Sequence, residues 1–379
     1  MTSRGGDVAI IGGGLIGLSI AFELAERGAT VRVFDRGEPG RGASWAGAGM
    51  LAPYAERIED EALLSLCRAS LERYPEFAAR ISDAGGVKVD VALDGIIEAA
   101  FDETQFAALA EVAAEGRARG IACELLDRRE AILAEPALGR TVTGAILIPG
   151  QGYVDNRRLG RALLAAVRAR GVTIHAPVAD LRVECDERRV LGVRSERGFA
   201  PAAVIVNAAG AWAGTIAGIP PHARVAVHPV KGQMLALAAP AGFLHRVTWL
   251  PGAYLVPRTD GRLLIGATVE DAGFDERVTA AGVGSLLQAA LAGAPSLGAF
   301  ALTETWAGLR PGSADGRPFI GPAALDGLVH ATGHYRNGIL LAPETARLVS
   351  NLVETGDASE LRPWLPLRMP AGTGRTLPA

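Results

Sequence analysis

The stretch from Asp7 to Asp35 constrains the fold of this chain more than any other segment. A short apolar run leads into glycines at the G-x-G-x-x-G spacing, Gly12, Gly14 and Gly17, and a helical apolar pattern follows them. A second apolar run then ends at the acidic residue. This order predicts a strand–turn–helix–strand unit of a Rossmann-type α/β fold.

Each part of this unit has a physical role in holding a dinucleotide. Gly12 permits the tight turn, Gly14 lets the backbone approach a pyrophosphate, and Gly17 lets the helix pack closely on the strand. The helix N-terminus offers free N–H groups, and the acid can accept the hydroxyl groups of an adenosine ribose. The unit alone leaves NAD and FAD equally open. The predicted contacts in it are Gly12, Gly14, Leu15, Ile16, Gly17 and Asp35.

Composition restricts the class of protein. A chain of 379 residues with 49% apolar and 21% charged residues suits a globular enzyme of two domains. The net charge of −3 gives no electrostatic case for nucleic acid. The apolar runs are short and no signal peptide is evident, so we expect a cytoplasmic protein without a membrane span. Cys67, Cys123 and Cys185 form no metal or redox motif, and no other metal-ligand spacing is present.

Two further segments carry small residues where a flat ligand needs them. The segment after Asp35 contains Ala43, Ser44, Ala48 and Gly49, followed by the soft apolar side chain of Met50. Residues 203–208 predict a buried parallel strand that ends in the small residues Ala208 to Gly210, with Trp212 expected in the core. The nucleotide domain is therefore expected to be discontinuous, and this small-residue wrapping favours FAD.

The remaining pattern predicts a second domain built from an antiparallel sheet and helices. Among the helices, we expect one from Asn156, as its cap, to Arg170, and one over 339–354 with Asn337 as cap and Pro343 in its first turn. The expected division of the chain is 1–86, 145–222 and 305–379 for the FAD-binding domain, and 87–144 and 223–304 for the substrate-binding domain.

Three stretches outside the first unit concentrate guanidinium groups and phenols. They are PGAYLVPR with Tyr254, WAGLRPGSADGRPFIG with Arg310, and GHYRNGI with Arg336. None of them supplies a Ser/His/Asp set or a reactive Cys. Such donors suit a small carboxylate, because arginine binds it as a bidentate fork and tyrosine adds a hydrogen bond. Arg258 and Arg317, in the same stretches, are expected to be structural.

These motifs, with AGAGMLAP, VKGQ and GRLLIGAT, resemble the FAD-dependent D-amino-acid oxidase superfamily, and within it the glycine oxidases of thiamine biosynthesis. The resemblance covers nearly the whole chain, and implies that Arg310 binds the substrate carboxylate, that Tyr254 supports it and that Arg336 lies near the flavin. It implies non-covalent FAD, since no Cys lies in the C-terminal flavin stretches. The implied FAD contacts are Asp35, Arg36, Ala43, Ser44, Ala48, Gly49, Met50, Val178, His334, Tyr335, Arg336, Asn337, Gly338, Ile339 and Leu340, beside the predicted Ala208 and Gly210.

The activity implied is oxidative deamination of glycine, or of small amines and D-amino acids such as sarcosine and D-alanine, with O2 as acceptor and H2O2 as product. In thiamine biosynthesis the glycine imine supplies the thiazole. The resemblance also suggests a homotetramer. No side chain is identified as a catalytic base. Gly252 stands where some members carry a His, which predicts a more open pocket rim. Three alternatives stay open: a D-amino-acid dehydrogenase, a sarcosine-oxidase-like enzyme and a non-catalytic flavin-binding module.

Overall fold

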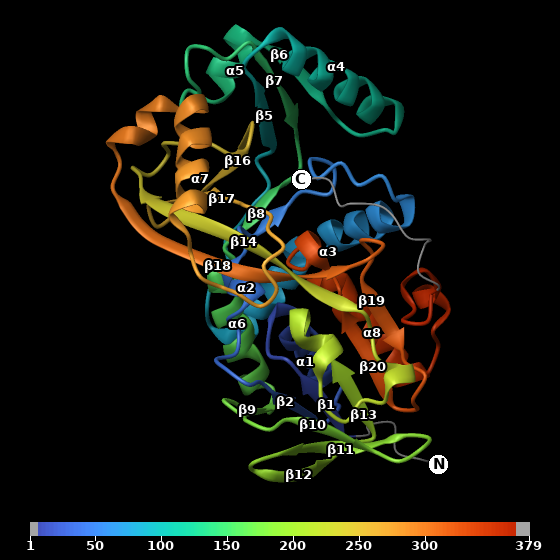
Figure 1. Ribbon diagram of the computed structural model, residues 1–379. Coiled ribbons are helices and arrows are strands. Elements are labelled where there is room, and N and C mark those ends of the chain that lie inside the picture. The colour runs from blue at the N-terminus through green and yellow to red at the C-terminus, as the bar shows by residue number, and fades with distance from the viewer. Residues whose placement is uncertain (1–6, 369–379) are drawn as a thin grey trace.

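Two large β-sheets organise residues 7–368, the part of the chain that the computed structural model describes (Figure 1). One sheet lies in the lower half of Figure 1 and the other in the upper half, with long strands running between them. The six-stranded sheet consists, in spatial order, of β19 (Phe319–Pro322), β20 (Leu328–Thr332), β13 (Val204–Asn207), β1 (Val8–Ile11), β2 (Val31–Phe34) and β9 (Thr173–His175). The eight-stranded sheet consists of β18 (Leu302–Ser313), β14 (Val227–Ala238), β17 (Arg262–Gly266), β16 (Ala253–Pro257), β15 (Val247–Leu250), β5 (Ile96–Ala100), β7 (Gly144–Ile148) and β6 (Glu124–Asp127).

The predicted strand–helix–strand unit is confirmed and lies at the centre of the six-stranded sheet. β1 is fully buried and pairs in parallel with β2 on one side and β13 on the other. The turn needs its glycines: Gly12 has φ +105°, and a Cβ on Gly17 would overlap the Gly12 carbonyl oxygen. Helix α1 (Leu15–Glu26) can therefore lie close to β1, as a dinucleotide turn requires.

Helices cover the six-stranded sheet and bury its apolar face. α1 packs against α6 (Asn156–Ala169) and α8 (Ala342–Thr355), and α3 (Glu61–Gly85) packs against both of these. Their apolar stripes join the strand residues in one core cluster. All but one of the strand pairings in this sheet are parallel. A parallel sheet is covered on both faces, and this explains why its strands are near-continuous apolar runs.

The eight-stranded sheet has a different apolar cluster on each face. Neighbouring residues of β14 show this: Met234 packs into the cluster that contains α4 (Glu103–Ala118), and Leu235 into the one that contains α7 (Ala280–Gly293). This alternation is the two-residue period of a strand. All pairings are antiparallel except that of β15 with β5. The predicted second, antiparallel part of the fold is therefore present.

Two predicted helix caps are wrong. Asp155, not Asn156, caps α6 by accepting the Arg158 N–H at 2.9 Å. The Asn156 side chain is buried and bonds to the Ser44 carbonyl at 2.7 Å, so a tertiary contact uses it. Asn337 lies in a short 3₁₀ turn, and α8 begins after it at Ala342, with Leu341 as cap.

The expected domain boundaries cut two strands of the eight-stranded sheet. β7 begins at Gly144 and β18 at Leu302, whereas the predicted divisions fall at 145 and 305. The six strands of the other sheet all lie within the ranges expected for the nucleotide domain. The division of the chain into two folding domains stays a prediction.

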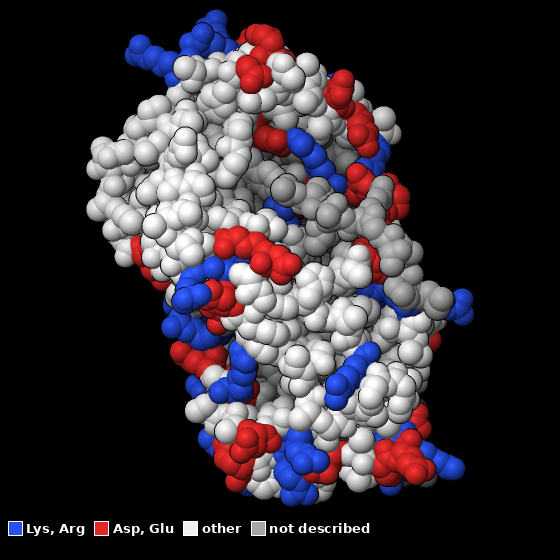
Figure 2. All heavy atoms as spheres, in the orientation of Figure 1, with Lys and Arg blue, Asp and Glu red and all other residues white. Residues whose placement is uncertain are grey.

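The surface gives no single-signed field on the face drawn in Figure 2. Acidic and basic side chains alternate over its lower half, a basic group lies at the top left, and few of either lie on the left flank below that group. None of the helices within residues 7–368 is long and apolar enough to cross a membrane. The same residues hold no cluster of three His, Cys, Asp or Glu that could bind a metal.

Candidate functional site

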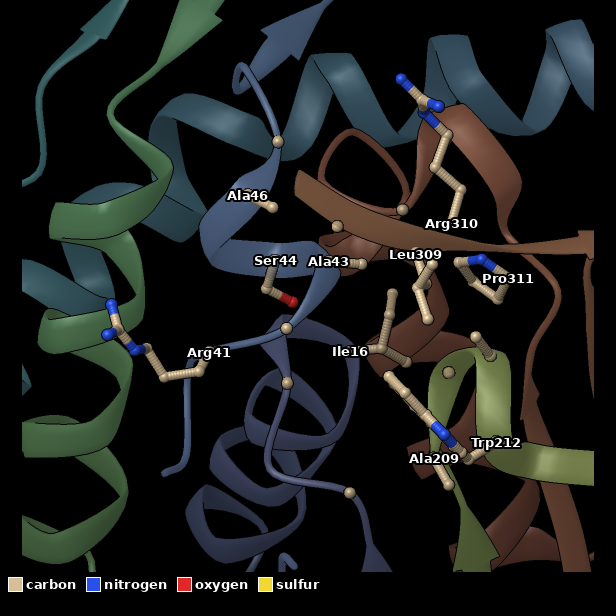
Figure 3. A pocket seen from close by; sticks show the side chains of 18 of the residues that line it. Ile16, Arg41, Ala43, Ser44, Ala46, Ala209, Trp212, Leu309, Arg310 and Pro311 are labelled. Atoms are coloured by element: carbon tan, nitrogen blue, oxygen red, sulfur yellow. The ribbon is translucent and has the colours of Figure 1, made fainter. Parts of the chain in front are cut away.

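A cavity of about 720 Å³ lies between the two sheets and is lined by residues of both. Figure 3 shows Arg310 at the top of the view and Trp212 at the lower right, with Ile16, Ala43 and Ser44 between them. The cavity therefore runs from the six-stranded sheet, past the glycine turn and the first residues of α2 (Ala43–Ala46), to β18.

Asp35 holds the glycine turn in place from the end of β2. One carboxylate oxygen accepts the Gly13 N–H at 2.6 Å, and the other accepts the Gly37 N–H at 2.8 Å. Ser44 adds to this by accepting the Leu15 N–H at 2.9 Å. Since a carboxylate has about four lone-pair sites, these bonds leave Asp35 able to accept from a ligand hydroxyl. The protein's own hydrogen bonds therefore hold the conformation of the glycine turn.

An arginine–tryptophan stack closes the end of the cavity next to this turn. The Arg36 guanidinium lies 3.5 Å from the ring centroid of Trp212, whose other neighbour is Phe274 at 5.4 Å. Trp212 lines the cavity, so the expectation that it belongs to the core is wrong. Val178, which donates its N–H to the Asp35 carbonyl at 2.9 Å, lies at the same end.

The small-residue segment forms the middle of the cavity wall. A side chain at Gly49 would overlap the Val154 carbonyl, so this close approach requires glycine. Arg258 donates to the Ala48 carbonyl at 2.7 Å and to Asn156 at 3.1 Å. Burial lowers the pKa of Arg258 to about 10. Arg258 therefore fixes this wall, which supports the structural role expected for it.

The segment from His334 to Leu341 is held from behind by α3. The Tyr74 hydroxyl donates to the Ile339 carbonyl at 2.9 Å, and the Ser70 hydroxyl donates to the Leu340 carbonyl at 2.6 Å. The imidazole of His334 is buried and lies 3.1 Å from the Thr345 hydroxyl. Burial lowers the pKa of His334 to about 3, so the ring is neutral at physiological pH.

The far end of the cavity brings the predicted Arg310, Tyr254 and Arg336 together. Arg310 donates to the backbone carbonyls of Lys231 at 3.2 Å and Thr268 at 3.1 Å. Burial raises the pKa of Tyr254, against the effect of the two arginines, so its hydroxyl stays protonated and can donate. Three hydrogen-bond donors thus line one end of the cavity.

Glu56 is the residue at this end that the sequence analysis missed. Its carboxylate lies 3.0 Å from Arg336, and its side chain is only 10% exposed. Burial raises the pKa of Glu56, although Arg336 and Arg310 act in the opposite direction. The available signal was a carboxylate directly after the small-residue segment, in a stretch too apolar for a solvent loop.

Most of the predicted contacts line the cavity, and four do not. The N–H of Leu15 and the Cα of Gly17 serve the turn itself, while Asn337 and Leu340 serve the start of α8 and the contact with α3. Those that line the cavity are Gly12, Gly14, Ile16, Asp35, Arg36, Ala43, Ser44, Ala48, Gly49, Met50, Val178, Ala208, Gly210, Tyr254, Arg310, His334, Tyr335, Arg336, Gly338 and Ile339.

The residues present fit a bound FAD. Gly210 has φ +56° and no atom within 4 Å of where a Cβ would stand, and a Cβ on Gly14 would meet only the Ser44 hydroxyl, at 3.2 Å. The backbone on both sides is thus open to a ligand lying across the turn. The cavity is long enough to place one end of that ligand by Trp212 and the other by the arginines. None of the three cysteines lines the cavity: Cys67 and Cys123 are buried elsewhere, and Cys185 is half-buried.

The chain belongs to the DAO family of FAD dependent oxidoreductases, whose model matches residues 7–352. Its cofactor is accordingly FAD. The fold agrees: the crystal structure of glycine oxidase from Geobacillus kaustophilus superposes with a TM-score of 0.90, at 35% identity over 97% of this chain and all of the other.

Two relatives show how the match extends along the sequence. The chain is 36% identical to a glycine oxidase of Pseudomonas aeruginosa, covering 91% of this chain and 94% of that protein. It is 40% identical to a bifunctional ThiO/ThiG protein of Synechocystis sp., covering 92% of this chain but 51% of that protein. The chain thus spans about half the length of the ThiO/ThiG proteins that it matches.

Proposed function

We propose that this chain oxidises glycine, and to some extent sarcosine and D-alanine, to the imine, which water converts to the oxo acid and ammonia or the primary amine. The observation that carries the proposal is Arg310. Among residues 7–368 it forms no ion pair, and it donates hydrogen bonds to two backbone carbonyls. A guanidinium group that faces a cavity and has no carboxylate in direct contact favours a carboxylate ligand.

The chain's own residues would hold the substrate for a transfer that needs no side-chain base. FAD supplies the acceptor for the hydride leaving the substrate Cα, and O2 takes up the two electrons as H2O2. Arg310 would bind the carboxylate, and the Tyr254 hydroxyl would donate to it. Burial and the net positive charge at this end disfavour an ammonium ion, so the substrate amine would lose its proton on binding. Its lone pair is then available as the hydride leaves.

The cofactor-binding roles follow the same geometry. Asp35 would accept from the ribose, the α1 N-terminus would face the pyrophosphate, and the His334–Ile339 segment would lie along the flavin. The two sheets would form the FAD-binding and substrate-binding domains. The names of the relatives support a role in supplying the glycine imine for thiamine synthesis, because ThiO is joined to ThiG in several of them.

An oxygen-uptake screen with glycine, sarcosine, D-alanine and D-proline tests the proposal. We expect glycine to reduce the bound FAD without oxygen, seen as bleaching of the yellow absorbance, and to produce H2O2 in air. Bleaching without H2O2 would indicate a dehydrogenase. A flavin that none of the four compounds bleaches would overturn the proposal and favour a non-catalytic flavin module.

A further inference from the structure

The two arginines at the far end of the cavity differ in their charge environment. The Arg336 guanidinium lies 3.0 Å from the Glu56 carboxylate, and its side chain is partly buried. Arg310 faces the same space, forms no ion pair with a carboxylate of the described residues and donates to two backbone carbonyls, while Glu56 acts on it more weakly than on Arg336. The end of the cavity thus contains two cations and one carboxylate, which leaves one positive charge without a partner.

Glu56 is held at Arg336 by the structure of its own loop. The loop connects β3 (Met50–Leu51) to α3, and the buried side chain of Gln151 accepts the N–H groups of Tyr54 at 2.9 Å and Ala55 at 3.3 Å. The next residue, Arg57, turns outward and pairs with Glu98 at 2.7 Å. The carboxylate therefore points into the cavity without needing a ligand to position it.

The Glu56–Arg336 ion pair disfavours the binding of a second negative charge beside it. A ligand with two carboxylates would place its second one near Arg336, where Glu56 already neutralises the guanidinium and would repel a second anion. A ligand with one carboxylate meets Arg310 alone and leaves the pair intact. Like-charge contact is an effective way to reject a competing ligand.

We propose that Glu56 determines the charge of the substrate: by occupying Arg336 it restricts the site to monocarboxylates, and without it Arg336 binds a second anionic group. This inference rests on the proposed function, because it takes Arg310 as the site of the first carboxylate. It deepens that function by defining the excluded class, namely dicarboxylates such as N-carboxymethylglycine (iminodiacetate).

The test compares two ligands of the same shape that differ by one charge. Oxydiacetate and its monoamide have no amine to oxidise, so their dissociation constants follow from the change they cause in the flavin absorbance of the FAD-loaded protein. For Glu56→Gln we expect the affinity of oxydiacetate relative to the monoamide to rise on the order of tenfold over the wild type. An unchanged ratio would overturn the proposal.

The control is Glu304→Gln, which removes a carboxylate that is paired with Arg157 at 2.8 Å and lies outside the cavity lining and away from the loop of Glu56. It should leave the ratio unchanged. In the double variant Glu56→Gln/Arg336→Gln the gain should disappear, because Arg336 is the group that binds the second carboxylate. A gain that persists in the double variant would contradict the assignment to Arg336.

Should Glu56→Gln be unstable, Arg336→Gln tests the pair from the other side. It leaves the Glu56 carboxylate unpaired, so oxydiacetate should weaken relative to its monoamide, again on the order of tenfold. No change would count against the proposal. The binding readout is separate from turnover: a protein that does not oxidise glycine but shows these ratios would lose its proposed activity and keep this selectivity.

Discussion

The guanidinium group of Arg310 lies directly against the Cα of Gly232. The two residues come from the paired strands β18 and β14, and any side chain at Gly232 would overlap the guanidinium nitrogens. The missing Cβ gives Arg310 the space to reach the carbonyls of Lys231 and Thr268. Glycine at this position therefore sets the place of the arginine.

Gly232→Ala should displace Arg310 and weaken glycine binding. We expect KM for glycine to rise about tenfold while kcat changes less, because the loss falls on carboxylate binding. Oxygen-uptake kinetics measure both constants. Gly284→Ala is the matched control, since Gly284 is exposed on α7 and a methyl there meets no atom within 4 Å. A normal KM in Gly232→Ala would show that the carboxylate binds elsewhere.

Arg310→Lys should separate the contribution of the positive charge to glycine binding from that of the planar guanidinium shape. Lysine retains the positive charge but lacks the planar fork of the guanidinium group. We expect the fall in kcat/KM for glycine to correspond to about 1–3 kcal/mol of lost transition-state stabilisation in Arg310→Lys, and to about 2–5 kcal/mol in Arg310→Ala. Arg317→Lys serves as control, because Arg317 pairs with Asp60 at 2.6 Å outside the cavity lining. Equal kinetics of Arg310→Ala and the wild type would remove Arg310 from the site.

Asp35→Asn should weaken FAD binding. The NH2 group that replaces one carboxylate oxygen cannot accept a hydrogen bond, so the N–H of either Gly13 or Gly37 loses its acceptor and the turn loosens. The ribose also loses a charged acceptor. We expect about 1.5–3 kcal/mol of lost FAD affinity, measured by titrating the FAD-free protein. Asp83→Asn, on the exposed side of α3, should bind FAD like the wild type.

The neutral His334 should make the protein less stable in acid. Its pKa is about 3 in the folded protein and near 6.5 in an unfolded chain, so between these values the unfolded state binds the extra proton. Stability is therefore lost as the pH falls through 6.5 toward 3, by about 2 kcal/mol between pH 8 and pH 5 from this group.

Urea unfolding of the FAD-loaded protein at both pH values measures this loss. His334→Gln has no titrating ring, so its stability should depend less on pH than that of the wild type by about that amount. Equal pH dependence in the two proteins would mean that His334 is not the group responsible. His330, also buried with a lowered pKa, remains in both proteins and cancels in the comparison.

Local chemistry explains which parts of the fold were predictable. The spacing of Gly12, Gly14 and Gly17 fixes a turn with few alternatives, and the apolar runs of β1 and β13 have no competing interpretation. The DAO-type fold, the FAD cofactor and the enzyme class were correctly predicted, because several motifs point to the same family.

The wrong or missing predictions concern residues whose role depends on contacts with residues far away in the sequence. Asp155 and Asn156 are both good caps, and only the contacts of Asn156 with Arg258 and Ser44 settle which one is used. Trp212 was expected in the core because its stacking partner Arg36 is far away in the sequence. Glu56 was missed for the same reason, since Arg336 lies near the other end of the chain.

The order of strands in the six-stranded sheet has a consequence for synthesis. β1 (Val8–Ile11) is translated well before its neighbour β13, which ends at Asn207, and before β20, the next strand beyond β13, which ends at Thr332. The glycine turn therefore lacks its full support until Thr332 has been translated. Until β13 is made, the edge of the apolar strand β1 that faces away from β2 stays unpaired, which makes it a site where chaperones are expected to act.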